Sequence, residues 1–407
     1  MKSVKLASIL FYLNSVFVVF CFVSCGSSPT EASSLLTADI RGGMDKPGLL
    51  GLGDEIKGVT FVPLEVTTDD ASLIDGVYDY AVTDRYIYVL PVKEPRIVLF
   101  DRQGRFIRTL VKEGQGPGEF RGILPCIQVD ERNDRLFLFS NNRVWEYTLE
   151  GEFIGQSTHE YSVIYMRHIG KDRFAAISFP FQPFNGGGFG LGLFSRKGDT
   201  IAIKNDFYSF LLPHEKSGFT TSIAPAYSDA QNSVLFKTGS NDTVFCISAD
   251  RISAACVLDL KNSDAEVIRS LDVTDMSNLR IEKKDPKDIF VQDMIEFPGH
   301  YYFRLLYNQG YYIASVDKKT GKTLVEKCVM PGSIYELADA NLQHGMQGTR
   351  SYRNFPVWGR VIKDELVQVV TPYELNLYKS LRSITIPQEL NLKGEEGNPV
   401  FVFYSLI

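Results

Sequence analysis

The sequence contains few of the residue patterns by which catalytic and metal sites are usually recognised. Its 407 residues include five histidines and six cysteines. It has no HExxH motif, no CxxC pair and no GxSxG motif. These absences remove the local signatures of zinc hydrolases, of cysteine-based zinc sites and of α/β-hydrolases. The sequence therefore assigns no catalytic residue and leaves any metal site unspecified.

Positive charge is not in excess either. Lys and Arg number 43 against 49 Asp and Glu, which gives a net charge of −6, and no run of Lys and Arg occurs. A nucleic-acid binder needs a basic patch to meet the phosphates, so we expect no nucleic-acid partner. Tryptophan is scarce, with 2 residues, but there are 28 Phe and 20 Tyr. Tyr and Phe suit the half-buried surface of a strand, which favours β structure.

The N-terminal segment differs from the rest of the chain. Two lysines precede an almost wholly apolar run over residues 6–23, which is followed by Ser24-Cys25-Gly26. This arrangement resembles a bacterial lipoprotein signal, in which the cysteine thiol is lipidated and the cysteine becomes the new N-terminus. The sequence therefore predicts a signal peptide with a lipobox over residues 1–25, and lipidation at Cys25.

The alternative for this segment is a transmembrane anchor. Phe22 stands where lipoprotein signals usually have leucine, and about 18 apolar residues are enough to span a bilayer as a helix. The position of the cysteine, and the Ser, Thr and Gly residues after it, favour the lipid anchor. We expect residues 26–56 to form a flexible tether.

Four cysteines remain in the mature chain, at positions 126, 246, 256 and 328. An exported protein could oxidise them. Cys246 and Cys256 flank a predicted hairpin turn, but symmetric pairing about that turn sets Cys246 near Ser253 and Cys256 near Thr243. The two thiols are then not directly opposite. We expect four buried free thiols that act as small hydrophobic groups.

A hairpin pattern recurs with a fixed period. An apolar strand, a polar turn and a second strand are centred on Gly104, Gly151 and Gly198, so that both intervals are 47 residues. A weaker copy contains Gly321. Glycine supplies the positive φ that such turns require, and this period is typical of a four-stranded propeller blade. The part of the chain after the tether has room for six to eight blades of about 40–50 residues.

Three stretches of the chain match a known family. They are residues 105–120, which contain Gly114-Gln115-Gly116-Pro117-Gly118, and residues 61–65 and 398–404 near the two ends. Over most of residues 57–407 the sequence resembles the six-bladed β-propeller lipoproteins of the Bacteroidetes, distant relatives of the NHL-repeat propellers. The resemblance implies an all-β, six-bladed β-propeller with four-stranded antiparallel blades. It also implies an envelope location, as an outer-membrane lipoprotein that faces the periplasm or the cell surface, and it carries no agreed activity.

The two ends of the domain are predicted to close the ring. The first strand, over residues 59–66, and the last, over residues 400–405, both lack a blade of their own. In a closed propeller they can pair within one blade, with the N-terminal strand at its outer edge. Closure removes exposed sheet edges and counts against an open solenoid.

The glycine-rich stretch at residues 114–118 is not a phosphate-binding loop. A P-loop ends in Gly-Lys-Ser/Thr, and GxGxxG would need glycine at position 119, where Glu119 stands. We expect a tight crossover between two blades. Glu119 and Arg121 either pair with each other there or face a ligand.

The long connections are predicted to lie on one face. When the strands of a blade are lettered a to d from the axis outward, the b–c and d–a connections emerge on the same side. They include residues 113–121, 179–189, 206–227, 261–287, 330–355 and 371–397. Two of them carry clustered aromatic residues, of which the candidates for binding a ligand or partner are Phe181, Phe184, Phe189, Tyr208 and Phe210. Long loops on a rigid scaffold often bind partners, but these rings could equally pack the loops onto the propeller.

Three functions are compatible with these observations. The leading one is a non-enzymatic binding module, held by lipid at a bacterial envelope membrane, which meets an unknown protein or glycan through its loop-bearing face. The alternative is a metal-assisted, calcium-dependent hydrolase or lyase with its site in the central funnel, where isolated acidic residues would leave no local spacing. The third is a structural subunit of an envelope complex.

Overall fold

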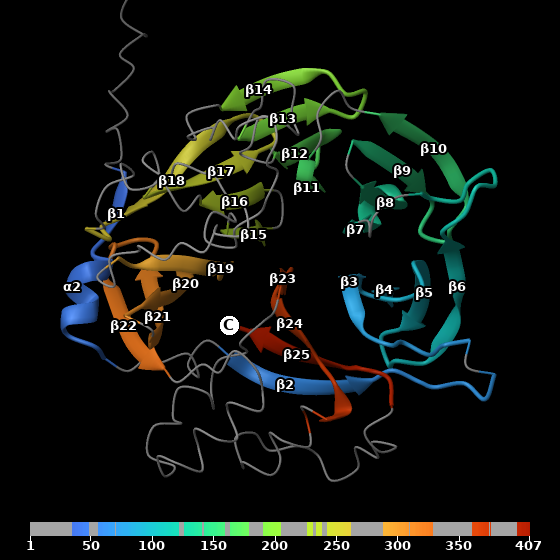
Figure 1. The fold of residues 1–407 in the computed structure, drawn as a ribbon, viewed down its shortest axis with the longest axis horizontal. Coiled ribbons are helices and arrows are strands. Elements are labelled where there is room, and N and C mark those ends of the chain that lie inside the picture. The colour runs from blue at the N-terminus through green and yellow to red at the C-terminus, as the bar shows by residue number, and fades with distance from the viewer. Residues whose placement is uncertain are drawn as a thin grey trace, which may run out of the picture. The chain divides into compact units, whose positions relative to one another are not determined.

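The chain forms a six-bladed β-propeller. The computed structural model describes residues 35–48, 56–69, 71–121, 126–140, 142–158, 163–178, 190–204, 226–230, 233–237, 242–261, 288–308, 310–328, 360–373, 375 and 397–407. These residues make six sheets, and Figure 1 shows them in chain order around a central axis. Within each blade the strands are antiparallel and the first strand lies nearest the axis. The predicted fold class is confirmed.

Each of the first three blades is one continuous stretch of chain. Blade 1 comprises β3 (Val77–Val82), β4 (Tyr86–Pro91), β5 (Arg96–Asp101) and β6 (Phe106–Lys112). Blade 2 comprises β7 (Cys126–Asp130), the 3-10 helix η2 (Glu131–Asn133), β8 (Arg135–Ser140), β9 (Arg143–Tyr147) and β10 (Phe153–Thr158). Blade 3 comprises β11 (Val163–His168), β12 (Arg173–Ser178), β13 (Leu191–Ser195) and β14 (Thr200–Lys204).

Two of the last three blades take strands from the N-terminal part of the domain. Blade 4 comprises β15 (Ala226–Ala230), β16 (Ser233–Lys237), β17 (Thr243–Ser248) and β18 (Ile252–Leu258), with β1 (Leu36–Ala38) as a fifth strand. Blade 5 comprises β19 (Phe290–Glu296), β20 (His300–Tyr307), β21 (Gly310–Asp317) and β22 (Thr323–Cys328). Blade 6 comprises β23 (Arg360–Ile362), β24 (Glu365–Val370), β25 (Val400–Leu406) and β2 (Ile56–Pro63).

The ring closes as the sequence predicts. β2 pairs antiparallel with β25 as the outer strand of blade 6, with Phe61 opposite Val402 and Pro63 opposite Val400. Both strands are rich in Val and Phe, which suit a pleated, half-buried surface. Val62 is buried in the cluster between blades 6 and 1, which also contains Phe401. The strand begins three residues earlier than predicted, at Ile56.

The repeated turns have the predicted backbone. Gly104, Gly151 and Gly198 adopt φ values of 81°, 88° and 93°, and Gly321 adopts 71°. All four lie in the turn between the third and fourth strands of a blade. Only glycine takes this left-handed conformation without steric cost. The period of 47 residues therefore marks equivalent turns in blades 1, 2 and 3.

The middle strands form the core because they are covered on both faces. Residues 87–90 of β4 and 136–139 of β8 are uninterrupted buried hydrophobic runs. An alternating pattern would leave one face polar, but stacked blades pack against both faces of these strands. The outer strands are different: β6 and β10 expose Ile107 and Ile154.

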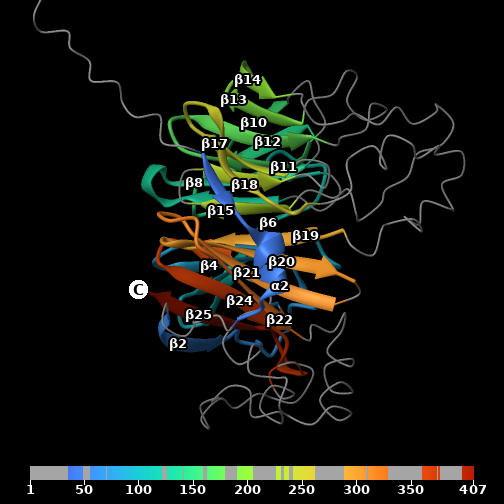
Figure 2. The same ribbon diagram turned by 90° about the vertical axis from the view of Figure 1, so that its left-hand side faces the viewer.

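Part of the predicted tether is folded onto the propeller. β1 pairs in parallel with β18, and the helix α2 (Ile40–Asp45) follows it, with Asp39 as its N-cap. Ala38 and Ile40 are fully buried, and α2 lies beside β22 in both views (Figures 1 and 2). The expectation of a flexible tether over residues 26–56 is therefore wrong for residues 36–48. The reason is that Ile40 and Met44 contribute apolar surface to the core between blades 4 and 5.

The described cysteines are free thiols. Cys256 is buried, whereas Cys126 and Cys246 are partly exposed. Cys246 lies opposite Ser253 as predicted, but a register shift places Cys256 opposite Val244 rather than Thr243. The side chain of Cys328 lies outside the described residues. No helix in the described part of the chain is long and apolar enough to cross a membrane.

Candidate functional site

The strand order separates the two faces of the propeller. Connections between the second and third strands of a blade, and crossovers from an outer strand to the next inner strand, all leave from one face, which we call the long-connection face. All six connections named from the sequence are of these two kinds. The turns that lie between first and second, or third and fourth, strands are short and define the short-turn face.

Most of the residues predicted to bind a partner lie outside the described residues. This holds for Phe181, Phe184, Phe189, Tyr208 and Phe210, and also for Cys25. Their roles in binding and lipidation stay predictions.

Glu119 and Arg121 lie in the crossover from blade 1 to blade 2. Glu119 Oε2 accepts a hydrogen bond from the Gly116 amide at 2.7 Å, and Arg121 Nε donates to the Gly114 carbonyl oxygen at 3.1 Å. Phe120 between them is fully buried and meets the Trp145 ring edge-on. The tight crossover is confirmed, and these contacts assign both side chains to holding the loop backbone. Binding of a ligand by either of them stays a prediction.

A cleft of about 210 Å³ opens on the long-connection face between blades 6 and 1. We call it the axial cleft, because the inner strands β3 and β23 form two of its walls. Its lining residues are Gly76, Val77, Tyr78, Tyr80, Arg360, Val369, Val370, Thr371 and Pro399. They come from the first residues of β3 and β23, the end of β24 and the approach to β25, and these are the strand ends that point to the long-connection face.

Arg360, which lines the axial cleft, forms an ion pair with a buried aspartate. Arg360 Nη1 lies 2.5 Å from Asp79 Oδ1 and donates to the Tyr80 carbonyl oxygen at 2.9 Å. The guanidinium also lies over the Tyr80 ring, 4.9 Å from its centroid. The Asp79 side chain is 4% exposed and that of Arg360 is 29% exposed. The arginine therefore presents part of a fixed positive charge to the cleft.

Asp79 joins three blades. Its Oδ2 accepts a hydrogen bond from the Ile127 amide of β7 at 2.7 Å, and its Oδ1 accepts one from the Tyr80 amide at 2.8 Å. With Arg360 from β23, the carboxylate is bonded to groups of blades 6, 1 and 2. A buried carboxylate is tolerated because charged and polar partners replace its water.

A β-bulge exposes Tyr78 beside this ion pair. The register between β3 and β4 shifts between Val77 and Asp79, so that Tyr78 is the extra residue and is 44% exposed. Partial burial raises the pKa of the Tyr78 phenol, and the nearby Cys126 and Asp79 raise it further. The side chain is therefore a neutral hydrogen-bond donor on an aromatic ring. Bulges often turn a side chain toward a functional site.

Exposed apolar side chains lie on the same edge of blade 1. Leu73 is 40% exposed and Val92 is 44% exposed. They are held near the bulge by two hydrogen bonds, from the Val92 amide to the Gly76 carbonyl oxygen and from Arg96 to the Leu73 carbonyl oxygen. Tyrosine and arginine beside apolar groups are typical of residues that anchor partners at interfaces.

The inner strands carry other polar groups, but they are used to join blades. Gln128 of β7 donates to the His168 carbonyl oxygen and accepts from the His168 amide. The His168 ring stacks on Phe137, and burial lowers its pKa, although Asp130 opposes the shift. Within the described ranges, no group of three or more His, Cys, Asp or Glu side chains is placed to hold a metal ion.

The amino-acid sequence predicts the face on which this cleft opens but not the residues that line it. The long connections leave from one face, as the sequence predicts, but the candidate binding residues chosen from the sequence were aromatic residues of those connections and did not include Tyr78, Asp79 or Arg360. An aspartate inside a short Val-Tyr-Asp-Tyr strand is a signal that could have been noticed. Its partner is 281 positions away, and no local spacing indicates that pairing.

A known family and several solved structures match the chain. The family described as "Domain of unknown function (DUF4934)" matches residues 35–405. A crystal structure of a Bacteroides fragilis protein, described as a candidate exported protein, is similar with a TM-score of 0.63 and 14% identity. The match covers 91% of this chain and 99% of that one, and at this identity it shows the fold alone.

Weaker similarities were found to other proteins of related bacteria. PorZ of Porphyromonas gingivalis, described as an essential surface component of the type-IX secretion system, matches with a TM-score of 0.34 and 9% identity. The match covers 74% of this chain and 30% of PorZ. A protein of unknown function from Bacteroides caccae matches with a TM-score of 0.31 and 11% identity, over 61% of this chain and 81% of that one. No curated protein matches the chain in sequence.

Proposed function

The chain belongs to the DUF4934 family, and we propose that it is a lipid-anchored envelope protein that binds a protein or glycan partner, without catalysis, through its long-connection face. The axial cleft carries the proposal. It places an exposed tyrosine and a fixed arginine on the face from which the long connections leave. Rigid walls with variable connections around them are typical of binding scaffolds.

The geometry of the cleft supports binding more than chemistry. Asp79 is held by Arg360 and two backbone amides. A general base needs a free lone pair within reach of the proton it removes, whereas this carboxylate is occupied by structural partners. The cleft offers an aromatic ring, a guanidinium and apolar surface. These groups suit a contact with a polar, partly apolar partner surface.

The location rests on the sequence. The predicted signal peptide and Cys25 would hold the protein by lipid at an envelope membrane. We propose the outer membrane, with the domain facing either the periplasm or the cell surface. A contact made through the long-connection face would leave the short-turn face free.

Site-specific cross-linking in the native cell tests the proposal. A photoreactive phenylalanine analogue replaces Tyr78 in one strain and Gln103 in another. Gln103 is the matched control, because it is exposed in a turn of the same blade on the short-turn face. We expect an adduct from position 78 and none from position 103. Protease and glycosidase digestion of the adduct then distinguishes a protein from a glycan.

Two results would contradict the proposal. One is equal cross-linking from both positions, which would indicate non-specific contact. The other is an adduct from position 103 alone, which would place the partner on the short-turn face.

A further inference from the structure

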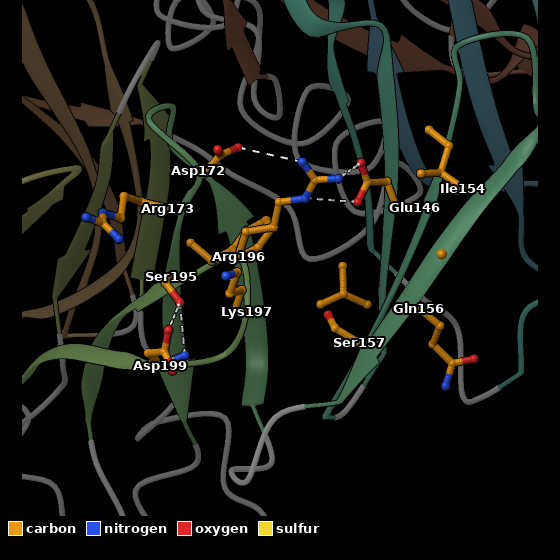
Figure 3. Close-up of a pocket in the computed structure, with 13 residues that line it drawn as sticks. Glu146, Ile154, Gln156, Ser157, Asp172, Arg173, Ser195, Arg196, Lys197 and Asp199 are labelled. Carbon is orange, nitrogen blue, oxygen red and sulfur yellow. Dashed lines mark hydrogen bonds and ion pairs between the residues drawn. The ribbon is translucent and has the colours of Figure 1, made fainter.

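A second cavity, on another part of the propeller, has no role in the proposed function. It holds about 670 Å³ and lies between blades 2 and 3. Figure 3 shows its two walls. One comes from β9 and β10, and the other from residues 172–174 and from the turn of residues 195–199. That turn belongs to the short-turn face, so the cavity is separate from the axial cleft.

The corresponding gap is closed between blades 6 and 1 and between blades 1 and 2. In blade 1, a Cβ added to the turn residue Gly104 would lie 2.2 Å from the carbonyl oxygen of Pro63, in the outer strand of blade 6. In blade 2, a Cβ on Gly151 would lie 3.1 Å from Leu110 Cβ, in the outer strand of blade 1. In both places the turn touches the preceding outer strand. Between blades 2 and 3 the same two elements form opposite walls of the cavity.

Between blades 4 and 5 the chain itself fills this gap. β1 adds to the free edge of β18, with Leu36 opposite Cys256 and Ala38 opposite Leu258. A Cβ on Gly321, the turn glycine of blade 5, would lie 3.0 Å from the Thr37 carbonyl oxygen and 3.2 Å from Leu36 Cδ1. An extended segment thus fits between the outer strand of one blade and the turn of the next.

The outer strand β10 offers a comparable edge. Among the described residues it pairs with β9 alone. Four consecutive residues, Ile154 to Ser157, line the cavity, and a Cβ on Gly155 would have nothing within 4 Å. The face of β10 at Gly155 therefore borders open space, and its outer edge has no strand partner among the described residues. Unpaired strand edges bind extended peptides through main-chain hydrogen bonds.

Three apolar side chains line the cavity, two from blade 2 and one from blade 3. Val144 and Phe174 are buried at 4% and 1% exposure, and Ile154 is 40% exposed. These three side chains suit an aliphatic group, as the neighbours of Leu36 do between blades 4 and 5.

Positive charge exceeds negative charge around the one buried carboxylate of the cavity. Glu146 Oε1 lies 2.6 Å from Arg135 Nε, and Glu146 also binds Arg196 through both of its oxygens. Two guanidinium groups thus share one carboxylate, and the exposed Lys197 is next to Arg196. Asp172 lies 3.9 Å from Arg196 but is 74% exposed, so water screens that pair. Asp199 also lines the cavity, exposed and hydrogen-bonded to Ser195. The excess of positive charge is therefore local to Glu146, where two guanidinium groups meet one carboxylate, and an acidic group is favoured there.

We propose that an extended segment of a partner polypeptide binds in this cavity as a strand added to β10. An aliphatic side chain of the segment contacts Val144, Ile154 and Phe174. An acidic side chain lies near Arg196 and Lys197. The bound segment extends the sheet of blade 2 at β10, as β1 extends the sheet of blade 4 at β18.

A displayed library of random octapeptides is the probe. It is selected on the full chain in detergent and counter-selected on Gly155→Trp, which fills the cavity. We expect enriched peptides with aliphatic and acidic residues that bind the wild type at least tenfold more tightly than Gly155→Trp. Lys197→Glu should weaken them at least threefold. Methylation of alternate peptide backbone amides along one edge should abolish binding, whereas methylation along the other should not.

Gly58→Trp is the matched control. Gly58 lies in the outer strand β2 and also has nothing within 4 Å of an added Cβ, but the gap beside β2 is closed by the Gly104 turn. We expect this variant to bind the peptides within twofold of the wild type. The proposal fails if no peptide depends on Gly155, if binding is insensitive to amide methylation, or if Lys197→Glu leaves affinity unchanged. Methylation of the peptide amides requires no change in the protein. It therefore tests the proposed strand pairing even if a protein variant misfolds.

Discussion

Replacing Ile40 with alanine should destabilise the propeller, although Ile40 lies in a segment that the sequence predicts to be a tether. Its side chain is fully buried in the cluster that contains Leu258, Leu260 and Val325. Truncating a buried isoleucine to alanine costs about 2–5 kcal/mol in lost burial and cavity formation. Alanine recovers only a few tenths of this through its higher helix propensity. The cost is a large part of the roughly 5–15 kcal/mol that stabilise a typical domain.

Thermal unfolding of the full chain measures the effect. Over residues 36–407, at about 2.1 cal/mol/K of unfolding entropy per residue, the loss corresponds to a decrease in Tm of roughly 3–6 °C. Leu35→Ala is the control, because Leu35 is 44% exposed and precedes β1 directly. A substitution there should change stability by less than about 0.5 kcal/mol. Equal Tm values for Ile40→Ala and the wild type would show that residues 36–48 behave as a tether, and that β1 and α2 add nothing to the fold.

Three further expectations concern the anchor, the ring closure and a buried lysine. Cells that produce Cys25→Ala should incorporate no labelled fatty acid into this protein, and label retained by the variant would refute lipidation at Cys25. Val62→Ala in β2 should lower the free energy of unfolding, measured in urea, by about 1–3 kcal/mol. Val59→Ala, at a position that is 46% exposed, should lower it by less than about 0.5 kcal/mol. Equal losses would contradict closure through β2. Burial lowers the pKa of Lys237 from 10.5 to about 8, so the unfolded state binds more protons between these values and this residue's contribution to stability rises with pH across that window. The stability difference between Lys237→Met and the wild type should therefore shrink by about 3 kcal/mol from pH 8 to pH 10.5, and a constant difference would refute the shift.

Much of the fold could be predicted because its signals are local. The turn glycines at positions 104, 151 and 198 each need a positive φ, and a conformation of a few residues is encoded by those residues. The closing strand was predictable for a different reason. Residues 59–66 and 400–405 each form a strand pattern with no blade of their own, so pairing the two is the arrangement that leaves no open edge.

The segment of β1 and α2 could not be predicted in the same way. Its composition resembles that of a linker, with two adjacent glycines inside α2. What orders it is a partner about 220 residues away in sequence, since Arg41 donates its backbone amide to the Asp259 carbonyl oxygen and its Nε to that of Leu260. Burial against blades 4 and 5 outweighs the weak local helix preference, which is the usual case for short helices. The register of Cys256 was missed because a bulge in β18 adds one residue.

The axial cleft was missed because its central groups serve the fold as well as the site. Asp79 satisfies the Ile127 amide and balances the Arg360 charge, so Asp79→Ala would leave a buried amide unpaired, at about 1–3 kcal/mol. It would also leave an arginine without its carboxylate, a loss that is strongly destabilising for buried pairs. In a variant at Asp79, lost binding could therefore not be distinguished from a weakened junction of blades 6, 1 and 2. Tyr78 stands outside this network on the bulge, with nearly half of its surface exposed. Partner binding is best tested at Tyr78, where the side chain can be exchanged while the three blades stay joined.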